Sequence, residues 1–137
     1  MGFCNGGFDD NSYRAADSVN ALKWNDLSKP EYQETVEYYK GLLAFRKAHP
    51  ALRLQFREEV LAAVKPVALE NPQAAAYLVD ENILVIFNAS ATEVSVSLPA
   101  GIWNLNIYKN TAGIHALSQV ENHIEAAPIS ATVLTRE

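Results

Sequence analysis

Residues Glu93 to Leu98 read EVSVSL and alternate strictly between polar and apolar side chains, as expected for a β-strand with one buried face. The two valines and Leu98 would point into a core, and the two serines would face solvent. Other short runs rich in Val, Ile, Tyr and Leu are bounded by turn-forming residues, and we expect strands at Ala74 to Asp80, Ile83 to Asn88, Ile102 to Lys109, Gln119 to Glu125 and Ile129 to Thr135. Short strands at this spacing predict an antiparallel β-sandwich, with the last run at a sheet edge.

A long helix is predicted upstream of these strands, from about Pro30 to His49. The segment SKPE, Ser28 to Glu31, has the pattern of a capping box at a helix start, and Pro50 would end the helix. About half of the circumference of this helix is apolar and needs a large partner surface; the residues are Tyr32, Val36, Tyr38, Tyr39, Leu42, Leu43 and Phe45. A further short helix is expected at Arg57 to Val64.

Several charged or aromatic residues have a structural interpretation that outweighs a functional one. Arg46 falls within the apolar arc of the helix, which predicts a buried ion pair or capping contact. His49 is better explained as a cation at the negative end of the helix dipole than as a catalytic base. His115 and His123 lack the spacing of metal ligands and are predicted at the surface. Trp103, in an alternating strand, is more often a core residue than a sugar platform.

The composition excludes several classes of partner and site. The chain of 137 residues has 11 basic and 16 acidic side chains and a formal net charge of -5, which disfavours nucleic acid and anionic membranes. One cysteine, Cys4, excludes an internal disulfide, and no zinc-site spacing is present. We therefore expect no cofactor and no metal. The sequence has neither an apolar run of membrane-spanning length nor a signal-peptide pattern at its start.

The first residues combine an irregular loop with groups that suit a sugar ligand. Glycine, Asn and Asp dominate Gly2 to Asn11, and the run DDNSYRAADSVNALKW follows from Asp9 to Trp24. Polar side chains at Asp10, Asn11 and Ser12 could bond sugar hydroxyls, and Tyr13 offers an aromatic face. Arg14 follows Asp10 by four residues, so a salt-bridged pair is geometrically feasible. Taken alone, the run is more often a purely structural polar turn.

Four segments together resemble the C-terminal end of type I pullulanases, which are debranching enzymes of the α-amylase superfamily. Besides the run from Asp9 to Trp24, they are EYYKGLLAFRKAHPALR (Glu37 to Arg53), ILVIFNAS (Ile83 to Ser90) and APISATVL (Ala127 to Leu134). The resemblance implies a mainly β chain in three parts. Residues 1–52 would be the end of a catalytic (β/α)8 barrel, with the loop after strand 8 and the final helix. Residues 53–66 would be a connector, and residues 67–137 a C-terminal β-sandwich.

The same resemblance implies roles for individual residues. Substrate contact would fall to Asp10, Asn11, Ser12, Tyr13 and Arg14. Asp17 and Asn20 would brace the loop. The catalytic carboxylates of such enzymes lie on barrel strands upstream of this chain, so we expect no catalytic residue here and no activity of the chain alone.

The function implied is that of a structural segment, supplying part of a substrate subsite, in a glycoside hydrolase that cleaves α-1,6-glucosidic bonds in pullulan and branched α-glucans. Its partners would be the α-glucan and the missing barrel. Self-association through the helix face is a further expectation. We expect it to bind neither nucleic acid nor membrane. Both a cytoplasmic and a secreted parent stay open. The alternative is a stand-alone β-sandwich module that binds carbohydrate or protein. An apolar helix face left partly bare would favour the segment.

Overall fold

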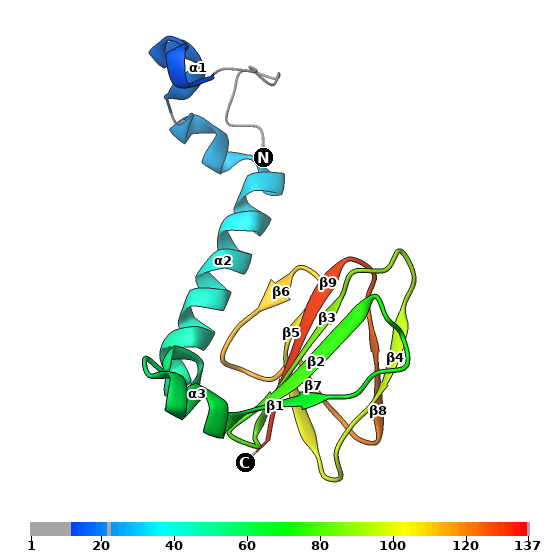
Figure 1. Ribbon diagram of the computed structural model, residues 1–137. Coiled ribbons are helices and arrows are strands. Elements are labelled where there is room, and N and C mark those ends of the chain that lie inside the picture. The colour runs from blue at the N-terminus through cyan, green and yellow to red at the C-terminus, as the bar shows by residue number, and fades with distance from the viewer. Residues whose placement is uncertain (1–11, 22, 137) are drawn as a thin grey trace. The chain divides into compact units, whose positions relative to one another are not determined.

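Antiparallel β-strands dominate the structure, a computed structural model that describes residues 12–21 and 23–136 (Figure 1). The chain divides into two units, Met1–Glu34 and Thr35–Glu137. All strands of the described residues lie in the second unit. The mainly β fold class predicted from the sequence is therefore confirmed. None of the helices in the described residues is long and apolar enough to cross a membrane.

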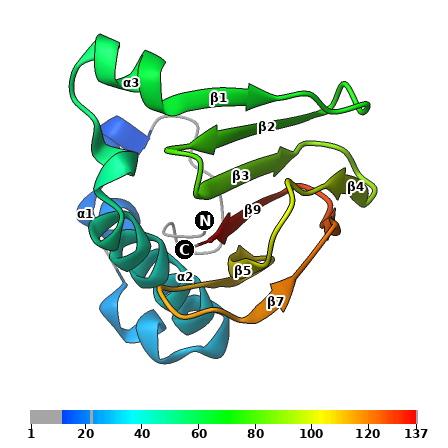
Figure 2. The ribbon, with the colours of Figure 1, turned by 90° about the horizontal axis from the view of Figure 1, so that it is seen from below.

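Seven strands form one large sheet, in which β7 pairs with β5 beside the main order β1-β2-β3-β9-β5-β6. Figure 2 shows the succession from β1 to β5. The strands are β1 (Val64–Val67), β2 (Ala74–Val79), β3 (Ile83–Asn88), β5 (Trp103–Tyr108), β6 (Thr111–Ala112), β7 (Ser118–Val120) and β9 (Ser130–Thr135). The sequence did not predict β1 and β6. Both are short, and β1 contains Pro66, which weakens the strand pattern.

The expectation that the last strand fills an edge is wrong, because β9 lies in the middle of the sheet. It pairs with β3 over six residues, from Ile83 opposite Thr135 to Asn88 opposite Ser130. Its other side pairs with β5, across an irregularity in register. Hydrophobic residues on both faces of β9 are buried, as a central strand requires.

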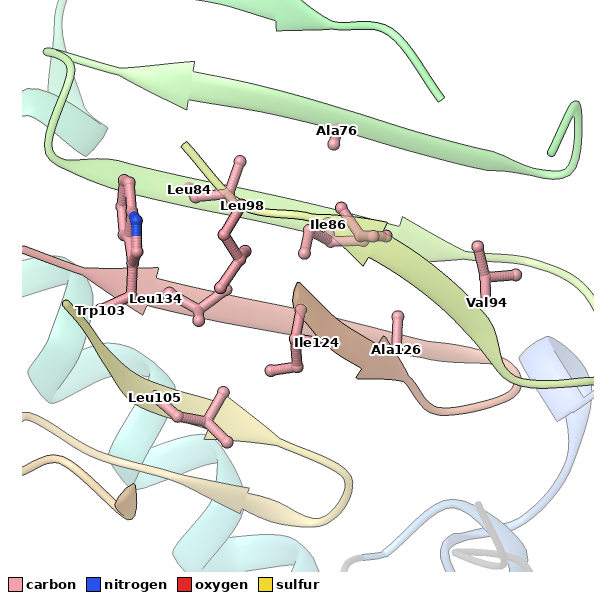
Figure 3. Close-up of a cluster of buried hydrophobic side chains, with 11 residues drawn as sticks. Ala76, Leu84, Ile86, Val94, Leu98, Trp103, Leu105, Ile124, Ala126 and Leu134 are labelled. Atoms are coloured by element: carbon pink, nitrogen blue, oxygen red, sulfur yellow. The ribbon is translucent and has the colours of Figure 1, made fainter. Parts of the chain in front are cut away.

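A second, two-stranded sheet covers one face of the large one and completes the sandwich. It consists of β4 (Val94–Ser97) and β8 (His123–Ala126). As predicted, the two valines of β4 and Leu98 are buried and the two serines are exposed. Figure 3 shows Val94 and Leu98 with Leu84, Ile86 and Leu134 of the large sheet, and the same cluster includes Val96 and Trp103. The Trp103 indole is fully buried and donates to the carbonyl of Pro99 at 2.8 Å, which confirms its role in the core.

The opposite face of the large sheet is covered by helix α2 (Pro30–Ala48), which Figure 1 places on the side away from β4 and β8. Phe45 is the buried residue of α2, and it belongs to a second cluster on this face of the sheet. Tyr38 and Leu42 pack against the same cluster. The sheet residues of the cluster are Val79, Ile83, Val85, Ile107 and Val133.

Gly41 allows the backbone of α2 to approach β6 closely. A Cβ atom placed on Gly41 would lie 1.9 Å from the carbonyl oxygen of Ala112. Real Cβ atoms do not approach a backbone oxygen so closely, and a backbone neighbour has little freedom to move aside. The helix therefore needs glycine at this position for a steric reason, despite the cost of glycine within a helix.

Both ends of α2 are close to the predicted positions, but the predicted capping box is wrong. Ser28 ends a preceding 3-10 helix, η2 (Trp24–Ser28), and its hydroxyl donates to the carbonyl of Asn25 at 2.8 Å. The carbonyl of Lys29 accepts from the amides of Tyr32 and Gln33, so Lys29 occupies the capping position. The Lys29 ammonium lies 2.7 Å from Asp26, and this hydrogen bond is the main reason why its pKa is raised.

The structure can be compared with the predictions for the residues after Phe45. His49 lies just beyond the helix, and its Nδ1 donates to the carbonyl of Phe45 at 2.8 Å, as expected of a residue at a helix C-terminus. Arg46 is exposed, and the ion pair or capping contact predicted for it is not formed within the described residues. A short helix, α3, spans Arg57–Ala63 as predicted, after a 3-10 turn, η3 (Pro50–Arg53).

Substituting Gly41 by alanine tests the contact between α2 and β6. Helix propensity alone would stabilise the variant by about 1 kcal/mol. We expect a net loss of about 1 to 3 kcal/mol in the free energy of unfolding, because the added methyl group collides with the Ala112 carbonyl. Gly113→Ala is the matched control, since a Cβ at Gly113 meets nothing within 4 Å. Urea denaturation followed by circular dichroism gives both values, and a Gly41→Ala variant as stable as the parent would contradict the close approach.

Candidate functional site

Three of the five predicted substrate-contact residues form one turn in the first unit. Ser12, Tyr13 and Arg14 make up the 3-10 helix η1 (Ser12–Arg14). The other two, Asp10 and Asn11, lie outside the described residues, and so does the predicted ion pair between Asp10 and Arg14. The arrangement of the candidate site is therefore described only from Ser12 onward.

Asn20 ties this turn to the short helix that follows it, α1 (Asp17–Asn20). Its side-chain amide donates to the carbonyl of Ser12 at 2.6 Å and to the carbonyl of Ala15 at 3.1 Å. The amide of Ala15 also donates to the carbonyl of Ser12, at 3.0 Å. One side chain thus holds both ends of the segment that carries Tyr13 and Arg14, and the predicted bracing role of Asn20 is confirmed.

For Asp17, the other predicted brace, the contact within the described part of the chain is made by the backbone. Asp17 starts α1, and its backbone carbonyl accepts from the amide of Ala21 at 2.7 Å. Beyond α1, the Lys23 ammonium donates to the carbonyl of Ser18 at 2.6 Å. The conformation of this stretch is therefore maintained mainly by side-chain amide and ammonium groups that bind backbone carbonyls, with little apolar burial.

The side chains presented by the turn are open to solvent. Tyr13 is 92% exposed, Arg14 is exposed and Ser12 is half-buried. An exposed phenol ring can stack on a pyranose, and the guanidinium and hydroxyl groups can bond to neighbouring sugar hydroxyls. Trp24, 69% exposed, is another aromatic surface in the same unit. These groups can bind a sugar, but they include neither a nucleophile nor an acid.

The described residues hold no cluster of three His, Cys, Asp or Glu side chains that could bind a metal ion. Asp26, a carboxylate near the turn in sequence, is engaged by Lys29. Hydrolysis of a glycosidic bond with retention requires two carboxyl groups about 5 to 5.5 Å apart across the bond. His115 and His123 are exposed, as predicted for surface residues. The described turn therefore offers groups that suit ligand contact and no such pair of carboxyl groups.

A polar pocket in the second unit was missed by sequence reasoning. It encloses about 280 Å³ and is lined by His49, Asn82, Ile83, Asn104, Asn106, Ile114, Ala116, Thr135 and Arg136. The signal that could have revealed it is the run NLN at 104–106, because asparagine is disfavoured within a strand. Asn106 is buried at 3% exposure, which places a polar side chain beside the core.

The chain is similar to a curated pullulanase from Bacillus subtilis, with 33% identity over 100 residues. The match takes in 68% of this chain and 14% of the relative. No family model matches the chain.

Solved pullulanases have the same fold over nearly the whole chain. The pullulanase from Bacillus acidopullulyticus covers 95% of it with a TM-score of 0.85 and 25% identity. The pullulanase from Anoxybacillus sp. LM18-11, complexed with maltotriose, covers 92% with a TM-score of 0.77 and 27% identity. The type I pullulanase from Bacillus subtilis, complexed with maltose, covers 90% with a TM-score of 0.75 and 28% identity. The chain spans only 17% or 18% of these longer proteins.

Replacing Asn20 by aspartate tests the brace on the turn. The change keeps the side-chain shape but removes both N–H donors and adds a charge that repels the carbonyls of Ser12 and Ala15. We expect faster hydrogen exchange of the Ala15 amide and shifted resonances for residues 12–15 in NMR spectra. Asn25→Asp is the matched control, since Asn25 is exposed on η2 and its side chain makes no hydrogen bond within residues 12–21 and 23–136. Equal effects of the two substitutions would count against the brace.

Proposed function

We propose that this chain, which belongs to the pullulanase family as a segment of its longer enzymes, has a structural role and supplies part of a substrate subsite. The enzyme would be a glycoside hydrolase that cleaves α-1,6-glucosidic bonds in pullulan and branched α-glucans. In this proposal residues 1–52 end the catalytic barrel, residues 53–66 connect, and residues 67–137 form the C-terminal sandwich. The partners are the α-glucan and the remainder of the enzyme.

The observation that carries the structural role is the uneven burial of α2. One side of the helix packs on the sheet through Phe45 and Leu42. On other parts of its circumference Tyr39 is 54% exposed and Leu43 is 67% exposed. A self-sufficient module is not expected to expose several large apolar side chains to solvent. A helix placed between a sandwich and a barrel needs apolar residues toward both, and this favours the segment over the stand-alone module.

The segment after α2 adds apolar surface that the sandwich leaves uncovered. Phe56, which precedes α3, is 63% exposed, and Leu61 of α3 is 64% exposed. Covering a side chain of this size contributes roughly 1.5 to 3 kcal/mol. We infer that the rest of the enzyme covers these residues, and that the isolated chain self-associates through them when that cover is absent.

The subsite role rests on the turn that Asn20 braces. Tyr13 presents nearly its whole ring, with Arg14 beside it in the same turn. A rigid aromatic side chain gives a sugar ring apolar contact at little entropic cost, and the neighbouring polar groups fix its orientation. Relatives have been solved with maltose and with maltotriose bound, so an α-glucan is the ligand class that we propose for this turn.

In this proposal the bond is broken by carboxylates outside the chain. A nucleophilic carboxylate would form a glycosyl intermediate, and a carboxylic acid would protonate the leaving oxygen. The turn would contribute by holding sugar units in register with those groups, since correct placement of the reacting bond lowers the barrier. The turn would therefore affect the rate only by positioning the substrate.

Leu43→Lys tests the structural role by comparing two contexts. In the isolated chain Leu43 is exposed, so we expect the free energy of unfolding to change by less than about 0.5 kcal/mol. In the full-length enzyme the same change should cost about 2 kcal/mol or more, because it would bury a charge and remove apolar contact. Gln33→Lys, at an exposed polar position of α2, serves as the control. An equally small effect of Leu43→Lys in both contexts would disprove the buried interface.

Tyr13→Ala in the full-length enzyme tests the subsite. We expect kcat/KM on pullulan to fall about threefold to tenfold, the loss of one aromatic contact. The melting temperature should stay nearly constant, because the ring is exposed, and Tyr13→Phe should retain most of the activity. The isolated 137-residue chain should release no reducing ends from pullulan. A parallel fall in activity and melting temperature would assign Tyr13 a structural role instead.

A further inference from the structure

The pocket lined by Asn104, Asn106 and Arg136 has more free hydrogen-bond donors than acceptors. The carboxamide oxygen of Asn106 accepts from the hydroxyl of Thr135 at 2.8 Å. The carboxamide oxygen of Asn104 accepts from the side-chain amide of Gln119 at 3.0 Å. Each asparagine therefore has its oxygen engaged within the chain, and what it can offer a ligand is N–H.

The nitrogens of the same two side chains retain donor capacity. The amide nitrogen of Asn106 donates once, to the carbonyl of Ile114 at 3.2 Å, and so keeps one hydrogen. The amide nitrogen of Asn104 makes no hydrogen bond within the described residues, although Asn104 is half-buried. A partly buried amide N–H is stabilised by a hydrogen-bond acceptor, and a ligand can supply that acceptor.

The charge of the pocket is positive. Arg136 is held by two backbone carbonyls: its Nε donates to that of Glu81 at 2.9 Å and its Nη1 to that of Ala100 at 3.1 Å. Its guanidinium also lies 4.7 Å from the ring centre of Trp103. These contacts fix the group in place. The Glu81 carboxylate interacts with it electrostatically but is paired with Lys65, and among the described residues no carboxylate lines the pocket or forms a salt bridge with Arg136. The remaining nitrogen, Nη2, is a further donor.

We propose that this pocket binds a carboxylate group, which its fixed guanidinium and the amide N–H groups of Asn104 and Asn106 would hold. A carboxylate brings acceptors and a negative charge and needs no acceptor in return, which matches what the lining side chains leave free. A sugar ring would favour a tyrosine or tryptophan platform, but the apolar part of the lining is Ile83, Ile114 and Ala116. The pocket shares no residue with the turn that carries Tyr13, and carboxylate binding there does not depend on the proposed function.

An NMR titration of the isolated chain with acetate and with succinate tests the proposal. We expect saturable shifts of the side-chain amide signals of Asn104 and Asn106, with sodium chloride at equal ionic strength giving none. Maltose at the same concentrations should leave these signals unchanged. Shifts that rise linearly with acetate and succinate, or saturation with maltose alone, would overturn the proposal.

Asn104→Asp supplies the matched variant. Its carboxylate still accepts from Gln119 but lacks the N–H donors and repels an anion, so we expect carboxylate affinity to fall at least about tenfold. Asn110→Asp adds the same charge at an exposed position in the turn beyond β5. The part of β5 that separates the two positions alone spans about 13 Å, which exceeds the screening length of roughly 8 Å. The affinity of this variant should stay within about twofold of the parent chain. Equal losses in both variants would show a general charge effect and no site.

Discussion

The large sheet is apolar on both faces, and the rest of the second unit is arranged to cover it. Side chains alternate across β3, so that Leu84 and Ile86 meet the two-stranded sheet while Ile83 and Val85 meet the helix. The first cover, formed by β4 and β8, is small and regular. The second cover is a single helix, and Gly41 lets it come close enough to exclude water. In the proposed function, the apolar residues that this helix exposes elsewhere would make it a bridge between two cores.

The first unit is stabilised by a different kind of interaction. Its turns depend on polar side chains that donate to backbone carbonyls, with Asn20 as the clearest case. None of the residues in its three short helices is buried. Such a segment gains its conformation from local hydrogen bonds, and leaves its aromatic side chains available for contact. In the proposed function the first unit contacts the ligand and the second supports the enzyme, and the two units differ in stabilisation accordingly.

Local patterns predicted the elements well, and long-range pairing limited the rest. The alternation in EVSVSL and the boundaries of β3 are read directly from side-chain chemistry. The position of β9 could not be read in this way, because strand order depends on which distant residues pair. The capping box failed because Lys29, and not Ser28, occupies the capping position of the helix. For the candidate site, Asn20 was foreseeable as a brace, whereas the pocket beside Asn106 depends on side chains from five separate segments.

The placement of β9 between β3 and β5 has a consequence for biosynthesis. Strands β1 to β3 and strand β5 emerge from the ribosome long before β9 does, and each group then ends in an open edge with unpaired backbone amides and carbonyls. The sheet can close only when residues 130–135 arrive to fill the gap. Nascent chains that stall or are cut before this strand would expose two sheet edges that can pair with other chains. Quality-control factors should therefore bind such truncated chains more strongly than complete ones.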